Sequence, residues 1–252
     1  EVVVVGYGVQ KKKLLTGATT QVKGDDIAKM NTTSPLQALQ GQTAGVNITT
    51  TSGQPGASMK VNIRGLGTTG SSSPLYLIDG VGGDISTLNP ADIESIDVLK
   101  DAASAAIYGA QAANGVVLIT TKSGKEGSAK VSFDSYIGIQ NVARAPKLLN
   151  AQEYKTIMDE YNLNMGTGAV NNWDAMTSTK GVDTDWFDAI IKDNASIQSY
   201  NLGITGGSKT STYAMSLGYL YQEGLIGGKG VSDMNRYNFR INSEHSSTRT
   251  SS

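Results

Sequence analysis

The chain lacks most of the residues from which compact reactive centres are built. Its 252 residues include no cysteine and a single histidine. Without cysteine the chain forms no disulfide, holds no thiolate-bound metal and offers no thiol nucleophile, although it remains compatible with an oxidising compartment. The one histidine, His245, lies in a polar stretch and cannot supply a site built from several histidines. We therefore predict no metal site and no cofactor site.

A strong net charge and a long apolar run are missing as well. The 21 basic residues nearly balance the 22 acidic ones, and aromatic residues make up 6% of the chain. This balance leaves no broad basic surface for nucleic acid, so we predict no nucleic-acid partner. No apolar run reaches the roughly 18 residues that a membrane-spanning helix needs, and the first residues do not form a signal peptide. Only strands are then expected to cross a bilayer.

What the chain has in quantity is glycine. Its 30 glycines stand with many serine, threonine and asparagine residues between short apolar runs. This texture is typical of strands and turns, so we predict a mostly β fold. Near residues 123–128 the pattern changes from short mixed elements to long alternating strands. We place a domain boundary there.

The first part of the chain predicts a small α+β body. Two short helices are expected at residues 25–30 and 34–40, the second with Ser34 as its N-cap. Asp101 is expected to cap an alanine-rich helix, and residues 114–115 to form a turn after it. Apolar runs bounded by glycine or proline are candidate core strands, at residues 46–49, 59–63, 75–78, 93–99 and 116–119.

The second part predicts long strands with one apolar face. Period-two alternation runs through residues 129–139, 198–204, 213–221 and 236–242, with a hairpin expected at 206–209. The charged residues inside these strands all fall on the polar face, and they are Lys130, Asp134, Arg236 and Arg240. A charge on the lipid side of an outer-membrane barrel costs roughly 2–4 kcal/mol near the midplane. The charge-free faces suit hydrocarbon, but a soluble sandwich produces the same alternation.

A long loop, residues 143–195, separates the first two of these strands. Asn150 is expected to begin a capping box for one helix, and Asp185 to cap a second, shorter helix. A loop of this length that contains Trp173 and Trp186 is suited to contact with a partner or a substrate. The alternative is a lid that packs on itself.

Two motifs suggest an enzyme or a metal site but lack the required context. Residues 65–70 match the dinucleotide pattern G-x-G-x-x-G, yet a strand is expected from Leu75, where a phosphate-binding loop would open a helix. The aspartates of residues 183–188 lack the glycine and the later glutamate of a calcium loop. No serine stands in a recognisable nucleophile motif. We therefore reject a nucleotide-dependent enzyme and predict that the chain is not an enzyme.

Three motifs resemble one known family. They are EVVVVGYG at residues 1–8, IRG at residues 63–65 and LKDAASAAIYGAQAANGVVLITTK at residues 99–122. In this order they resemble the SusC/RagA-like TonB-dependent transporters of Bacteroidetes outer membranes. The resemblance covers the chain from its first residue to about residue 242 and implies an α+β plug domain followed by antiparallel β-strands of an incomplete transmembrane β-barrel.

The resemblance also divides the chain into parts. Residues 1–10 would be the TonB box and linker, residues 11–125 the plug domain, and residues 126–252 the N-terminal part of the transmembrane β-barrel. Barrels of this kind need about 22 strands, whereas the alternation predicts four. Because an open sheet edge is not stable in lipid, we expect the chain to be a fragment.

The family pattern assigns roles to individual residues. The TonB box would consist of Glu1, Val2, Val3, Val4 and Val5, and it would pair edge to edge with TonB by strand addition. The β-branched run by itself predicts an extended backbone, which an ordinary buried strand would also explain. Arg64 would contact carboxylates of the barrel wall, because a buried arginine needs such partners. A solvated strand-end charge is the alternative.

The implied function is TonB-dependent import of a nutrient, namely a glycan, an oligosaccharide or a peptide. It would take place in the outer membrane of a Gram-negative bacterium, with the plug and the TonB box reaching the periplasm. The expected partners are TonB with ExbB and ExbD, a SusD-like surface lipoprotein that delivers the cargo, and outer-membrane lipid. The alternative is a secreted soluble β-rich binding module, in which the valine run is a core strand and the later strands form a sandwich.

Overall fold

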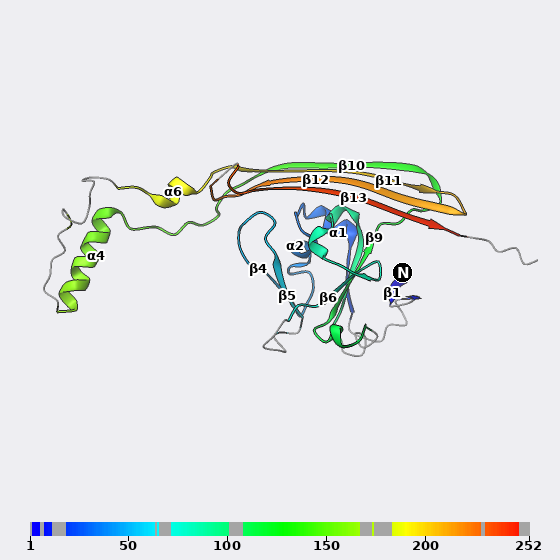
Figure 1. Ribbon diagram of the computed structural model, residues 1–252, viewed down its shortest axis with the longest axis horizontal. Coiled ribbons are helices and arrows are strands. Elements are labelled where there is room, and N and C mark those ends of the chain that lie inside the picture. The colour runs from blue at the N-terminus through cyan, green and yellow to red at the C-terminus, as the bar shows by residue number, and fades with distance from the viewer. Residues whose placement is uncertain are drawn as a thin grey trace, which may run out of the picture.

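The computed structural model describes residues 2–5, 8–11, 19–63, 65, 72–100, 108–166, 173, 183–227 and 230–246. Figure 1 shows an α+β body beneath one face of a long antiparallel sheet, and a helical segment that extends beyond one end of that sheet. We call the body, the described residues of 19–122, the plug, and the long sheet, β10–β13, the wall. None of the described helices is both long and apolar enough to cross a membrane.

A five-stranded sheet of order β3-β8-β9-β6-β7 forms the centre of the plug. Its strands are β3 (Thr19–Lys23), β8 (Ile93–Leu99), β9 (Val116–Thr121), β6 (Leu75–Ile78) and β7 (Val81–Gly82). β6 and β9 run parallel, whereas the other neighbours are antiparallel. The core strands predicted at 75–78, 93–99 and 116–119 are confirmed. β6 and the first four residues of β9 are continuous apolar runs, whereas β8 also carries Glu94, Ser95 and Asp97.

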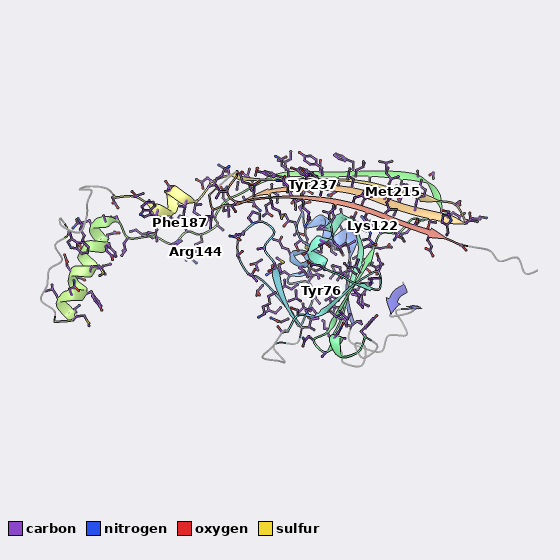
Figure 2. All side chains as sticks on the ribbon, in the orientation of Figure 1. Tyr76, Lys122, Arg144, Phe187, Met215 and Tyr237 are labelled. Atoms are coloured by element: carbon purple, nitrogen blue, oxygen red, sulfur yellow. The ribbon has the colours of Figure 1, made fainter. Side chains whose placement is uncertain are left out.

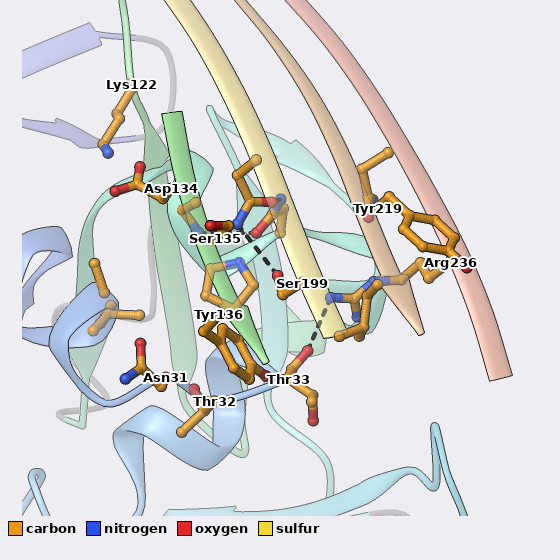
Figure 3. A pocket seen from close by; sticks show the side chains of 18 residues that line it. Asn31, Thr32, Thr33, Lys122, Asp134, Ser135, Tyr136, Ser199, Tyr219 and Arg236 are labelled. Atoms are coloured by element: carbon orange, nitrogen blue, oxygen red, sulfur yellow. Dashed lines mark hydrogen bonds between the residues drawn. The ribbon is translucent and has the colours of Figure 1, made fainter. Parts of the chain in front are cut away.

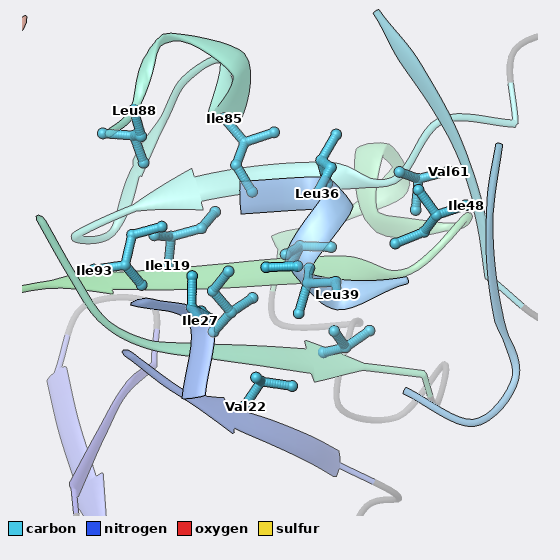
Figure 4. Packing of buried hydrophobic residues seen from close by; sticks show 14 of the residues in the cluster. Val22, Ile27, Leu36, Leu39, Ile48, Val61, Ile85, Leu88, Ile93 and Ile119 are labelled. Atoms are coloured by element: carbon cyan, nitrogen blue, oxygen red, sulfur yellow. The ribbon is translucent and has the colours of Figure 1, made fainter. Parts of the chain in front are cut away.

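Two short helices and a two-stranded sheet complete the plug. They are α1 (Gly24–Lys29), α2 (Pro35–Leu39), β4 (Val46–Thr50) and β5 (Met59–Ile63), and all four confirm predicted elements. Figure 4 shows Ile27 of α1 and Leu39 of α2 packed with Ile93 and Ile119 of the sheet. Ile27 and Ile93 are 0% exposed, so the helices close one face of the sheet.

One detail of the predicted capping is wrong. Ser34 occupies the N-cap position of α2, but its side chain makes no capping hydrogen bond. The backbone N–H of Gln37, which a capping hydroxyl would bind, donates instead to the Ser34 carbonyl oxygen at 3.1 Å. This tight first turn already satisfies the donor, so the hydroxyl has no capping role.

The connection into β9 depends on a glycine. The alanine-rich helix predicted after Asp101 lies outside the described residues, but the turn predicted at 114–115 is confirmed, with a φ of 95° at Gly115. A Cβ atom at this position would lie 2.7 Å from Cδ1 of Ile63. Glycine therefore serves both the left-handed backbone and the close approach of β5.

The wall is an antiparallel sheet of order β10-β11-β12-β13. Its strands are β10 (Gly127–Gln140), β11 (Ala195–Gly207), β12 (Ser211–Glu223) and β13 (Asp233–His245). All four predicted strands are confirmed. The hairpin turn lies slightly later than predicted, at residues 208–210, because β11 continues through its two terminal glycines. A Cβ on Gly207 would lie 2.7 Å from the Ser211 carbonyl oxygen, so this glycine permits the close approach at the turn.

The register of the wall gathers apolar side chains on the face away from the plug. Phe133 lies opposite Leu202, Leu202 opposite Leu217, and Leu217 opposite Phe239. Phe133 is 64% exposed and Phe239 is 71% exposed, because no second sheet covers this face in the described part of the chain. Figure 2 shows Tyr237 on the same outer side. The alternative sandwich, which would bury this row within the chain, is therefore contradicted.

Two further helices lie in the loop between β10 and β11, beyond the end of the wall (Figure 1). They are α4 (Ala151–Asn164) and α6 (Trp186–Ile190). Both predicted caps are confirmed, because Asn150 and Glu153 form a capping box and the Asp185 carboxylate accepts two backbone N–H groups of α6. No residue of α4 is buried, so its apolar side chains contribute to no core.

Candidate functional site

The N-terminal segment forms a hairpin that is separate from the plug sheet. β1 (Val2–Val5) pairs antiparallel with β2 (Gly8–Lys11) in a sheet of two strands. The valine run is therefore not a strand of the plug sheet. Among the described residues β1 has this one partner strand, which leaves a second backbone edge for strand addition. Glu1 lies outside the described residues.

Arg64 and most of the dinucleotide-like motif, residues 66–70, also lie outside the described residues. The contact of Arg64 with the wall therefore stays a prediction. The hydrogen bonds between plug and wall that the structure does describe come mostly from β13, and they reach both the ends of β6 and β9 and the connections between plug elements.

Arg240 of β13 joins the wall to the ends of β6 and β9. Its Nη2 pairs with the carboxylate of Asp79 and donates to Oγ1 of Thr121 at 2.6 Å. The same carboxylate accepts the backbone N–H of Thr121 at 2.8 Å and its hydroxyl at 2.7 Å. Asp79 adopts a left-handed φ of 49°, which aspartate tolerates because its short side chain bonds locally. These three side chains form one cluster, in which a charge-assisted bond crosses from wall to plug.

The next inward residues of β13 bind carbonyl groups of the plug backbone. Arg236 donates from Nη2 to the Thr33 oxygen at 2.9 Å and from Nη1 to the Ser86 oxygen at 3.3 Å. Asn238 donates from Nδ2 to the Thr87 oxygen at 2.6 Å. Ser86 and Thr87 belong to the 3-10 helix η2 (Ile85–Thr87), whose last carbonyls have no partner within the helix. Side chains of the wall thus donate hydrogen bonds to backbone carbonyl groups of the plug that have no partner within their own helix.

A glycine of the wall lets one side chain of the plug reach between two strands. Asn89 donates from Nδ2 to Oδ1 of Asn201 on β11. A Cβ on Gly218 of β12 would lie 2.4 Å from that same nitrogen. Because Gly218 lies opposite Asn201 in the register, the missing side chain opens the space that Asn89 occupies.

Asp92, the last residue of the 3-10 helix η3 (Pro90–Asp92), is a buried carboxyl at this interface and is 9% exposed. Burial raises the pKa of Asp92 above its usual 3.8. A hydrogen bond with Ser216 and the charges of Arg240 and Lys122 offset part of this effect. Burial therefore penalises the ionised form of Asp92 relative to the protonated form.

Polar cavities separate the direct contacts. One of about 180 Å³ lies between plug residues 31–33 and strands β10, β11 and β13. Figure 3 shows Arg236 reaching Thr33 at this cavity, and Tyr136 close to Thr32. Within the described residues, the buried hydroxyl of Tyr136 and Nε of Arg236 have no hydrogen-bond partner. A space of this volume accommodates several water molecules, each of which takes about 30 Å³ in the liquid. The interface thus combines few direct bonds with polar gaps.

This arrangement of contacts is suited to reversible docking of the plug against the wall. Its bonds are single hydrogen bonds and one charge pair, each of which water can replace in turn. In the described ranges, no group of three or more His, Cys, Asp or Glu residues is placed to hold a metal ion. The geometry therefore supports docking of one body against another.

Comparisons with known proteins agree with this geometry. The family description "TonB-dependent Receptor Plug Domain" matches residues 11–116. TonB-dependent receptor P26 of Formosa agariphila is 40% identical over 250 residues, which cover 96% of this chain and 24% of the relative. TonB-dependent receptor SusC of Bacteroides thetaiotaomicron is 35% identical over 256 residues, again covering 96% of this chain and 24% of the relative.

A solved structure extends the agreement to the arrangement of plug and wall. The structure of the RagAB peptide importer in its open-open state aligns with a TM-score of 0.77 and 32% identity, over 97% of this chain and 30% of that chain. The chain belongs to the SusC/RagA-like family of TonB-dependent receptors. It spans about a quarter of the length of the curated relatives it matches. In this receptor, the α+β body is the plug, and β10–β13 are strands of an incomplete barrel wall.

Sequence reasoning identified one side of this interface better than the other. Arg236 and Arg240 were predicted to lie on the polar face of their strand, and this is the face that meets the plug. The plug residues Asp79, Asn89 and Thr121 were not singled out. A usable signal for Asp79 was its position directly after an apolar strand and before Gly80, where a polar side chain is typical of a turn.

Proposed function

We propose that the receptor to which this chain belongs imports a nutrient across the outer membrane by a TonB-dependent mechanism. The chain supplies the plug and strands of the wall, in a channel that works with a SusD-like lipoprotein. The observation that carries the proposal is the two-faced wall. Its inner face binds the plug through Arg236, Asn238 and Arg240, while its outer face is apolar and exposed. Such a sheet suits a wet lumen on one side and hydrocarbon on the other.

The cargo class is proposed from resemblance. One similar structure is named a peptide importer, which supports a peptide as cargo. A glycan or an oligosaccharide is the other class that the family resemblance implies. The proposal contains no catalytic step, and the relatives are named as receptors.

The proposed contact with TonB lies at the N-terminal hairpin. TonB, energised through ExbB and ExbD, would add a strand at Glu1–Val5, where the second edge of β1 offers backbone donors and acceptors. About four backbone hydrogen bonds at roughly 0.5–1.5 kcal/mol net each would make a contact of a few kcal/mol. Such a contact is reversible, as a transport cycle requires.

The proposed organisation of the chain follows the same logic. Residues 1–10 would be the TonB box and linker, residues 11–125 the plug domain, and residues 126–252 the barrel part. β9 ends at Thr121 and β10 begins at Gly127, which supports a boundary near residue 125. Arg64 would add a further contact to the wall.

The experiment uses the full-length receptor in its own bacterium, grown on single glycans or peptides. Val4→Pro removes a backbone N–H and so interrupts strand addition. We expect growth on the cargo to be lost, while the receptor is still recovered in the outer-membrane fraction. Val4→Thr is the matched control, because it keeps the backbone groups and the β-branched shape, and it should support growth. Unchanged growth of the proline variant, or recovery of the receptor in the soluble fraction, would contradict the proposal.

A further inference from the structure

Two arginines of β13 face the plug, and they differ in how their charge is balanced. Arg240 pairs with the carboxylate of Asp79. Arg236 makes no ion pair in the described part of the chain, and donates instead to the backbone carbonyl oxygens of Thr33 and Ser86. Carbonyl groups accept hydrogen bonds but carry no net charge. Because a charge removed from water is costly without an opposite charge, the half-buried Arg236 is suited to an anionic partner.

The cavity of about 180 Å³ between plug and wall is lined by this arginine. The other charged residues of the lining are Lys122 and Asp134. With two positive groups and one negative group, the lining carries one excess positive charge. The carboxyl of Asp92 lines an adjacent cavity, where the positive charges that act on it are those of Arg240 and Lys122. The excess charge at the larger cavity therefore belongs to Arg236.

Two hydrogen-bond donors at this cavity have no partner among the described residues. They are the hydroxyl of Tyr136 and Nε of Arg236, and both atoms are buried. The register places these two residues in the same row of the wall, on β10 and β13, and they interact electrostatically. Figure 3 shows both side chains at the cavity, with plug residues Thr32 and Thr33 opposite them. Buried donors favour an acceptor, so the cavity offers both positive charge and free donors to one ligand.

We propose that this cavity is a binding site for a small anion of the halide or carboxylate class, held by the Arg236 guanidinium and the Tyr136 hydroxyl. Both groups donate hydrogen bonds to the anion, and the guanidinium also balances its charge. Plug residues 31–33 line the other side of the cavity, so the complete site exists only while the plug is docked. The site goes beyond nutrient import, because it assigns a ligand that fastens the plug to the wall.

The proposed anion couples the docking of the plug to the composition of the lumen. A ligand that binds only the docked state lowers the undocked population by the factor 1 + [L]/Kd, which is about tenfold at ten times Kd. A free inorganic anion of the medium and a carboxylate group of a cargo share the chemistry that Arg236 recognises. Either one would strengthen docking, and its departure would weaken docking without any change in the chain.

The test measures limited proteolysis of the plug in the purified full-length receptor in detergent. Sodium chloride, sodium acetate and the sodium salt of a bulky sulfonate, 2-morpholinoethanesulfonate, are compared at equal ionic strength, so that screening is the same. We expect proteolysis to be several-fold slower in chloride or acetate than in the sulfonate, with a saturable dependence on concentration. Acetamide, the neutral analogue of acetate, should not protect the plug.

The two salts also distinguish the sources of the anion. A much lower half-protecting concentration for acetate than for chloride would identify a carboxylate group, such as a cargo carries, as the ligand of the site. An equal or lower concentration for chloride would identify a free inorganic anion. In both cases the site at Arg236 is supported.

Three variants separate the anion site from a purely structural role. Tyr136→Phe removes a donor without removing any described hydrogen bond. If nothing accepts from this hydroxyl, the variant should be protected as well as the parent receptor, whereas a bound anion predicts a several-fold higher half-protecting concentration. Arg236→Gln should abolish the anion dependence, whatever its basal rate of proteolysis. Asn238→Ala is the matched control, because it loses a neutral hydrogen bond from β13 to the plug and should keep the dependence.

Two results would overturn the proposal. Equal proteolysis in all three salts would show that water, or a carboxylate from another strand of the full receptor, meets the two donors. An anion dependence that persists in Arg236→Gln would place the effect elsewhere in the protein. Because none of these measurements involves TonB or growth, their failure leaves the proposed import standing. Unchanged growth of Val4→Pro would in turn remove the proposed import and leave the anion site in place.

Discussion

The plug and the wall are both rich in β-strands, yet they place their apolar side chains in opposite ways. In the plug, Ile27, Ile93 and Ile96 lie at the centre and are 0% exposed. In the wall, Phe133 and Phe239 lie on the outside and are 64% and 71% exposed. The same apolar residue types thus form a buried core in the plug and an exposed face on the wall. The plug is folded around its own core, whereas the wall keeps exposed apolar side chains on its outer face and polar contacts on its inner face.

The largest expected effect separates the two kinds of apolar residue. Ile96→Ala removes buried atoms and leaves a cavity, so it should lower the free energy of unfolding of the plug by about 2–5 kcal/mol. Ile139→Ala is the matched control, because Ile139 lies on the outer face of the wall and is 68% exposed. It should change plug stability by less than about 0.5 kcal/mol. Urea unfolding followed by hydrogen exchange of plug amides measures both, and equal effects would remove the distinction.

A second prediction tests the two faces of the wall. Phe239→Arg places a charge on the outer face and should cost about 2–4 kcal/mol when the receptor folds into lipid vesicles. Asn242→Arg, on the inner side of the same strand, should cost much less because it faces the lumen. Folding yield in vesicles, read from electrophoretic mobility, gives the comparison. Equal loss for both variants would show that the faces are not distinct in lipid.

A third prediction addresses the bond between the two regions. Gly218→Val should displace the Asn89 side chain from its hydrogen bond with Asn201, because a Cβ at residue 218 would already lie 2.4 Å from Nδ2 of Asn89. Overpacking of this kind costs typically 1–3 kcal/mol. Gly53→Ala is the control, since a Cβ there meets nothing within 4 Å. Limited proteolysis of the plug in the folded receptor should be faster for the valine variant, and unchanged proteolysis would argue against this contact.

The smallest expected effect concerns the pH dependence of the interface. The pKa of Asp92 is raised above its usual 3.8, mainly by burial. Its stabilising contribution is therefore fully present below pH 3.8 and is lost as the pH rises through the raised pKa. Asp92→Asn stays neutral, so it should raise Tm at pH 7 by no more than a few degrees. Its advantage should vanish below pH 3.8. A lower Tm for the asparagine variant at pH 7 would contradict the dominance of burial.

Much of the fold was predictable because local signals agreed with one another. The wall strands follow from period-two alternation, and the caps at Asn150 and Asp185 follow from side chains that bind nearby N–H groups. The side chain of Ser34 does not cap α2, because the backbone N–H of Gln37 donates to the carbonyl oxygen of Ser34 instead of to its hydroxyl. The turn before Ser211 was misplaced because glycine is common both in turns and where strands approach closely.

The interface could be predicted only from one side. Polar residues on one face of β13 predict a polar surface, but they do not predict which atoms of the plug contact it. Asn89 and Asn201, which are hydrogen-bonded, are 112 residues apart in the sequence. Arg236 binds the backbone carbonyl groups of Thr33 and Ser86, and a backbone carbonyl cannot be recognised from the pattern of side chains. Pairing across such distances depends on how the plug is placed beneath the wall, and no local periodicity encodes that placement.

We propose that the wall has one side that faces lipid and one side that faces the plug, and a scan of β13 distinguishes these two sides. Nitroxide labels at each position from 236 to 241, in the full receptor in lipid vesicles, report collisions with oxygen and with a polar nickel complex. We expect high oxygen and low nickel accessibility at Tyr237, Phe239 and Ile241, alternating with low accessibility to both reagents at the positions between them. Equal accessibility at neighbouring positions, or protection of the three outer positions from oxygen, would contradict it.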